Sequence, residues 1–136
     1  MLLSVFMLEI LTPKRQFYRG EVEALTCTLP DGQLTVLKSH RPMLAALEIG
    51  SIMIKKGGEW RTAFSSEGFI EVRPDEVLVF AQDCEWPEEI DTVKAEEIRE
   101  RELEKLRQKQ SLIEYHQTQI ALNRAMARLK VKKTVN

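Results

Sequence analysis

The distribution of glycine and proline divides this 136-residue chain into two parts. All six glycines and all five prolines lie at or before Pro87, and the segment 88–136 contains neither. Because these residue types are the strongest breakers of helix, the second part can form long helices, whereas the first is divided by turns. We therefore predict two domains, a turn-rich body at 1–87 and a helical arm at 88–136.

Short strands separated by turn residues are the pattern of the body. Three segments have the composition of tight turns, and each separates two apolar stretches: 30–32 (Pro-Asp-Gly), 56–59 (Lys-Gly-Gly-Glu) and 73–76 (Arg-Pro-Asp-Glu). Gly20 is expected to mark another turn. We expect strands at 3–11, 21–29, 33–37, 51–55, 60–65, 69–72 and 77–81. Many short strands at this spacing predict a β-sandwich or a flattened barrel.

The arm is predicted to be helical with one interruption. Asp91 can cap the start of a first helix, and Ser111 followed by Glu114 is a capping box that predicts the start of a second. One continuous helix and a hairpin of two helices both fit, because a break without glycine or proline is straightened at low cost. Ser111 and Glu114 are therefore a candidate helix hinge.

The two expected helices differ in their apolar pattern. The apolar residues of the first helix do not share one face. This pattern predicts that the first helix docks weakly on the body or is in contact on several sides. Six residues of the second helix share one face, which is typical of a helix that packs on a partner: Tyr115, Thr118, Leu122, Ala125, Met126 and Leu129.

Positive charge gathers at the end of the arm. The segment 115–136 has five basic residues and no acidic one, and Arg124 and Arg128 are four apart, hence on one helical face. Folding the arm into a hairpin brings Asp91, Lys94 and Arg101 near this pair. Two interpretations remain: an anion site built from guanidinium groups, or solvated charges that pair with acidic residues of the arm at 96, 97 and 100. Composition favours the second.

Other features exclude several classes of function. The net charge of −1 argues against a nucleic-acid partner. Cys27 and Cys84 are too far apart for a metal pattern and indicate reduced thiols. The apolar segment 1–11 is shorter than the roughly 20 residues of a membrane span, so any membrane association is expected through a partner. His40 and His116 have no nucleophile or carboxylate at a useful spacing, so we expect no catalytic residue and no metal site.

Short segments spread along the chain resemble the epsilon subunit of F-type ATP synthases, in the order of that family and from about residue 6 to residue 131. They are Thr12-Pro13, Tyr18, Gly20-Glu21-Val22, Asp31-Gly32-Gln33-Leu34, His40 with Pro42, Gly68-Phe69-Ile70-Glu71-Val72, Val77-Leu78-Val79 and Arg124-Ala125-Met126-Ala127-Arg128-Leu129. The resemblance implies a sandwich of about ten strands followed by a C-terminal α-helical hairpin. It also implies a non-catalytic subunit of the central stalk, with the gamma subunit, the c-ring and the catalytic alpha/beta hexamer as partners.

The resemblance further implies a regulatory role for the arm. Folded down, the arm permits ATP hydrolysis, and extended along gamma it blocks rotation. No cofactor is required, but several members of the family bind ATP as a regulatory ligand. The matching positions here are Glu85, Ile90, Asp91, Lys94, Ala95, Arg101, Arg124 and Arg128. Lys94 stands where the motif has arginine, and lysine lacks the planar fork of guanidinium, so we expect weak binding.

Loop residues of the body are the candidates for contact with gamma or the c-ring: Asp31, Gly32, Gln33 and His40. Gln33 stands where many members have glutamate, and Ser39 where the family often has glycine. A loop histidine bonded to backbone is an equal interpretation of His40. The resemblance places the protein peripherally at the cytoplasmic face of a bacterial cell membrane. The alternative from the pattern alone is an interaction adaptor with a helical arm, unrelated to ATP synthase.

Overall fold

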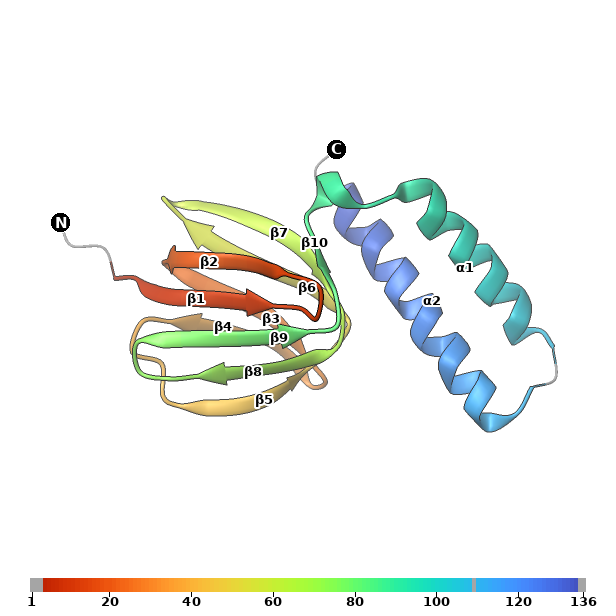
Figure 1. Cartoon of the computed structure of the whole chain (residues 1–136), viewed down its shortest axis with the longest axis horizontal. Helices are drawn as coiled ribbons and strands as arrows, with labels where there is room; N and C mark the ends of the chain where they lie inside the picture. Colours follow the sequence, from red (N-terminus) through yellow and green to blue (C-terminus); the bar gives the residue numbers. More distant parts are fainter. Residues whose placement is uncertain (1–3, 109, 135–136) are drawn as a thin grey trace.

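A computed structural model describes residues 4–108 and 110–134. In these residues ten strands form two five-stranded sheets, and two helices follow as an antiparallel hairpin (Figure 1). The predicted β-sandwich with a C-terminal helical hairpin is confirmed. Of the two arrangements open to the arm, the structure has the hairpin.

The first sheet has the order β2–β1–β9–β8–β5, with β1 and β9 parallel and the other pairs antiparallel. Its strands are β1 (Phe6–Leu11), β2 (Gln16–Val22), β5 (Met43–Leu47), β8 (Gly68–Val72) and β9 (Glu76–Ala81). The second sheet has the order β10–β7–β6–β3–β4, all antiparallel. Its strands are β3 (Ala24–Leu29), β4 (Gly32–Leu37), β6 (Gly50–Lys56), β7 (Glu59–Ser65) and β10 (Cys84–Glu85).

Alternating burial along the strands builds the core between the sheets. In β1, Phe6, Leu8 and Ile10 are buried and the residues between them are half-buried. This is the period of two expected where one face of a strand meets a core. Cys27 and Cys84 lie inside the same core as free thiols, and burial raises the pKa of each to about 11.

Four strands, β2, β3, β5 and β10, differ from those expected from the sequence. The segment predicted as one strand at 21–29 is the end of β2 and the whole of β3, which are separated only by a bend at Glu23. Gly20 does not mark a turn but lies within β2, opposite Leu8. β5 was missed because MLAAL has no β-branched residue, and β10 because it has only two residues.

The helical part begins with the short 3₁₀ helix η1 (Pro87–Glu89) and continues as α1 (Thr92–Leu106) and α2 (Leu112–Lys133). Asp91 caps α1, because its Oδ1 accepts a hydrogen bond from the Lys94 amide at 3.0 Å. Ser111 caps α2 in the same way, accepting from the Glu114 amide at 3.2 Å. Asp91 and Ser111 thus cap the two helices as predicted, and of the capping box predicted at Ser111 the structure has the bond from the Glu114 amide.

The arm rests on the sandwich through α2. This helix lies between α1 and the sandwich, and it contacts β6, β7 and η1 (Figure 1). The extensive contacts of α1 are with α2. Of the six residues predicted to share a packed face of α2, Thr118, Leu122 and Ala125 are buried. Tyr115 and Met126 are about half exposed because they lie at the margin of that face.

Candidate functional site: the contact between arm and sandwich

Arg128 is the central residue of the contact between α2 and the sandwich. Its guanidinium donates to Asp83 Oδ2 at 2.7 Å and to the carboxylate oxygens of Glu85 at 3.1 and 3.2 Å. It also lies over the ring of Phe64, 4.4 Å from the ring centre. The side chain is only 19% exposed, so these charge-assisted bonds are partly shielded from water.

Two further basic side chains of α2 extend this contact along the helix. Arg124 donates to Glu67 in the loop between β7 and β8. Lys132 Nζ donates to the carbonyl oxygen of Pro87 at 2.9 Å. We call the ion pairs of Arg124 and Arg128 with Glu67, Asp83 and Glu85 the latch.

An apolar cluster lies beside the latch. Phe64 of β7, Ile90 after η1 and Val131 of α2 are buried together, with Ile49 and Ala127 packed against them. The cluster holds the C-terminal half of α2 on the sandwich, but it is small. The attachment of the arm therefore combines this cluster with the ion pairs of the latch.

Opposing effects act on the Glu85 carboxyl of the latch, and its pKa is raised overall. Burial raises the pKa of Glu85, and the neighbouring carboxylate of Asp83 acts in the same direction. The hydrogen bond and the charge of Arg128 act in the opposite direction. Removal of the guanidinium would therefore leave two carboxylates close together and partly buried, which is unfavourable.

The residues predicted for nucleotide binding are only partly brought together. Glu85 and Arg128 are in direct contact, and Ile90 lies in the adjoining apolar cluster. Asp91 caps α1 and Ala95 is buried. The remaining three are Lys94, which is exposed, Arg101, whose Nε lies 3.6 Å from the Glu102 carboxylate, and Arg124, which is held by Glu67.

The partners expected for the two arginines were wrong. The sequence favoured pairing with acidic residues of the arm at 96, 97 and 100. The observed partners are carboxylates of the sandwich, 43 to 57 residues earlier in the chain. Sequence reasoning missed Glu67 and Asp83 altogether. The only available signal was the absence of acidic residues from 115 to 136, which leaves this end of the arm to seek them elsewhere.

The loop candidates lie in turns of the sandwich or beside them. Asp31 lies in the turn between β3 and β4, and Gly32, which has a φ of 138°, is the first residue of β4. Gln33 is exposed and lines a cavity of about 410 Å³ together with the end of α2. His40 bonds through Nδ1 to the carbonyl oxygen of Arg41 at 2.8 Å, which is the backbone-bonded arrangement considered for it.

Within residues 4–108 and 110–134, no group of three or more His, Cys, Asp or Glu side chains could hold a metal ion. No helix in the same residues is long and apolar enough to cross a membrane.

Both domains match family models. Residues 5–87 match the beta-sandwich domain of the ATP synthase delta/epsilon chain, and residues 88–133 match its long alpha-helix domain. A relative from Caldanaerobacter subterraneus, the ATP synthase epsilon chain, is 48% identical over 129 residues, which is 94% of each chain. The ATP synthase epsilon chain of Ruminiclostridium cellulolyticum is 40% identical over 127 residues, 93% of this chain and 95% of the relative.

Solved structures share the fold. A chain in the Euglena gracilis mitochondrial ATP synthase, in a structure of OSCP, F1 and c-ring, superposes with a TM-score of 0.80 at 23% identity. That match covers 93% of this chain and 80% of the other. A chain of the Tetrahymena thermophila mitochondrial ATP synthase central stalk and c-ring gives 0.64 at 14% identity, covering 93% and 96%. With both domains matched in order and close relatives over nearly the whole length, this chain belongs to the ATP synthase epsilon chain family.

Proposed function

We propose that the protein is a subunit of the central stalk of an F-type ATP synthase, where the sandwich links the gamma subunit to the c-ring. Membership of the family makes the chain a non-catalytic subunit of that enzyme. The structural relatives come from assemblies described as F1 with c-ring and as central stalk with c-ring, which supports this place. In such a place the protein lies peripherally at the cytoplasmic face of the bacterial membrane, without crossing it.

Contact with gamma and the c-ring is proposed for the exposed turns of the sandwich. The candidates are Asp31 in the turn before β4, Gly32 and Gln33 at the start of β4, and His40 in the loop after it. Co-purification tests the assignment, because the chain should be recovered with gamma, the c-ring and the alpha/beta hexamer. Recovery of a stable homodimer alone would favour the adaptor interpretation instead.

The second part of the proposal is that the arm is a brake on ATP hydrolysis. The observation that carries it is the latch, because a helical hairpin fixed by a few partly exposed ion pairs and one small apolar cluster can separate from the sandwich as a unit. Docked on the sandwich, the arm permits rotation. Released and straightened at the hinge of Ser111 and Glu114, it extends towards the catalytic hexamer and blocks rotation.

Arg128→Ala tests the brake. Charge-assisted hydrogen bonds contribute about 1.5–3 kcal/mol, so their loss should shift the arm at least about tenfold towards the released state. We expect the assembled complex to hydrolyse ATP more slowly than the wild type. Lys133→Ala is the matched control, since Lys133 is an exposed cation near the end of the same helix. Equal ATPase rates for Arg128→Ala and Lys133→Ala would count against the brake.

Nucleotide regulation is the third part. ATP would bind weakly to the folded arm with Arg124 and Arg128 as the phosphate ligands, in competition with the carboxylates that now hold them. Glu85, Ile90, Asp91, Lys94, Ala95 and Arg101 complete the proposed set. Calorimetry of the isolated chain with millimolar ATP tests this. An absence of heat would remove the nucleotide from the account and leave the brake in place.

A further inference from the structure

The contact surface between α1 and α2 changes character along its length. Ala95 and Glu102 are the buried residues of α1, and a spacing of seven places them on one face of the helix. Glu102 and Thr118 line one cavity, and both lie in the halves of α1 and α2 that adjoin the turn. Because the helices are antiparallel, the halves that hold Ala95, Leu122 and Ala125 meet further from the turn. The half of the contact near the sandwich is therefore apolar, and the half near the turn is polar.

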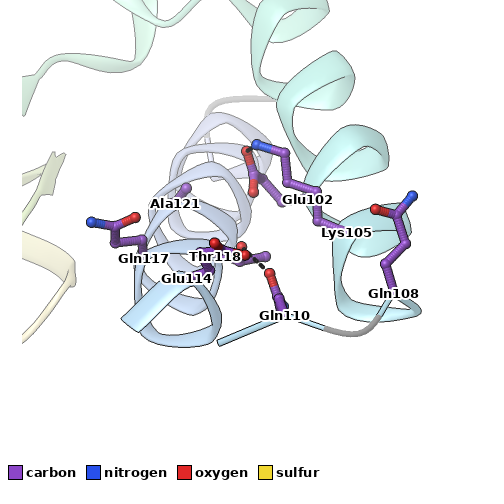
Figure 2. A pocket seen from close by; sticks show the side chains of 8 residues that line it. All are labelled: Glu102, Lys105, Gln108, Gln110, Glu114, Gln117, Thr118 and Ala121. Atoms are coloured by element: carbon purple, nitrogen blue, oxygen red, sulfur yellow. Dashed lines mark hydrogen bonds and ion pairs between the residues drawn. The ribbon is translucent and has the colours of Figure 1, made fainter. Parts of the chain in front are cut away.

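A polar cavity of about 420 Å³ occupies this second half (Figure 2). Glu102 and Lys105 reach it from α1, and Thr118 and Ala121 from α2. Glu102 is only 4% exposed, with its carboxylate 3.3 Å from Lys105 Nζ and 3.6 Å from Arg101 Nε. Both partners are at least half exposed, so water competes for them.

The amide of Gln110 indicates the same imperfect packing. Its Oε1 accepts a hydrogen bond from Thr118 at 3.3 Å, but its buried Nε2 has no partner among the described residues. A polar cavity of this size takes up water, so part of the space between the two helices is filled by water rather than by packed side chains.

From these observations we infer that Glu102 weakens the contact between α1 and α2. The two helices of the hairpin therefore separate first at the end near the turn. This inference rests on the proposed brake, because a hairpin that becomes a rod must first part its helices. A buried carboxylate with exposed partners costs stability that an apolar side chain of similar volume regains. Opening then starts at the polar half of the contact between α1 and α2, while Ala95, Leu122 and Ala125 hold the apolar half.

Hydrogen exchange of the full chain tests the inference through Glu102→Leu. Once parted from α2, the 15-residue α1 is a marginal helix, so its amides report opening. We expect exchange in α1 to slow by about tenfold. Glu104→Leu is the matched control, because Glu104 is 59% exposed on the same helix, and its exchange should stay near the wild-type rate. Exchange in β3 should not change in either variant.

Glu102→Gln guards against a misfolded leucine variant, since it removes the charge and keeps the shape. It should slow exchange in α1 by a smaller factor, about threefold. Wild-type or faster exchange in both Glu102 variants, with β3 unchanged, overturns the inference. Because the assay needs no other subunit, it is independent of the brake. Slower exchange without any change in the ATPase of the complex would refute the brake alone.

Discussion

At the scale of single residues, local geometry follows from local sequence. Asp91 and Ser111 cap their helices as predicted, because each cap joins atoms only three residues apart. The partners of Arg124 and Arg128 could not be predicted in the same way. Those partners lie far away in the sequence, and only the docking of α2 brings them near. Residue type predicted that the arginines would pair but not where.

Ser39 carries the clearest residue-scale prediction. Its φ of 66° is the only positive value among described residues other than glycine, and this conformation costs a side-chain-bearing residue about 1–2 kcal/mol. Ser39→Gly should therefore stabilise the sandwich by about 1 kcal/mol, after the added flexibility of the unfolded chain is subtracted. Urea denaturation measures this as a higher midpoint with an unchanged slope. Lys38→Gly should instead destabilise the sandwich and lower the urea midpoint, because φ at Lys38 is not positive.

At the scale of elements, apolar stretches between turn residues predicted most strands. The boundary between β2 and β3 and the pairing of β1 with β9 could not be predicted from the sequence. β2 and β3 look like one run because a single bend at Glu23, with no glycine or proline, separates them. That bend is held from a distance, since the Glu23 carboxylate accepts from the Gly58 amide at 2.8 Å. The pairing of β1 with β9 is equally invisible in local sequence, because it joins the two ends of the sandwich domain.

The element that joins sandwich and arm should make stability depend on pH. Glu89 of η1 pairs with both terminal nitrogens of Arg15 at 2.7 and 2.9 Å, and it also accepts from the Trp86 amide at 2.8 Å. The hydrogen bond from Arg15, more than any other cause, lowers the pKa of Glu89 from its ordinary value of 4.5. A carboxyl group whose pKa is lowered by folding stabilises the fold at pH values above its ordinary pKa of 4.5. This stabilisation is lost as the pH falls through the lowered pKa.

Glu89→Gln should therefore flatten the acid side of the stability profile. Thermal unfolding between about pH 5 and about pH 3 should show a smaller fall in Tm for this variant than for the wild type. Glu85 affects the pH dependence of stability in the opposite direction, because its pKa is raised. Its effect is the same in the wild type and in Glu89→Gln, since both proteins contain it. The difference between the two curves thus isolates Glu89. Parallel curves would mean that the Arg15 pair does not stabilise the junction.

At the scale of the whole molecule, the protein combines a sandwich domain with an arm that is held by two contacts, one between α2 and the sandwich and one between α1 and α2. The sandwich has a continuous core that spans both sheets. The arm is held to it by the latch and one small apolar cluster, and α1 is held to α2 across a contact that is polar near the turn. The absence of glycine and proline predicted the helical arm from the sequence. The contacts that hold the arm could not be predicted, because they join side chains that meet only after folding.

Locking the arm tests the central claim most directly. Glu67→Cys and Arg124→Cys replace one ion pair of the latch with two thiols that a cleavable bifunctional maleimide can join before the subunit is assembled. Cys27 and Cys84 should not compete, because both are buried and their pKa values are raised to about 11. The measurement is the ATPase rate of the assembled complex before and after cleavage of the linker. The brake predicts faster hydrolysis while the arm is locked and a fall when it is freed, and equal rates in the two states would contradict it.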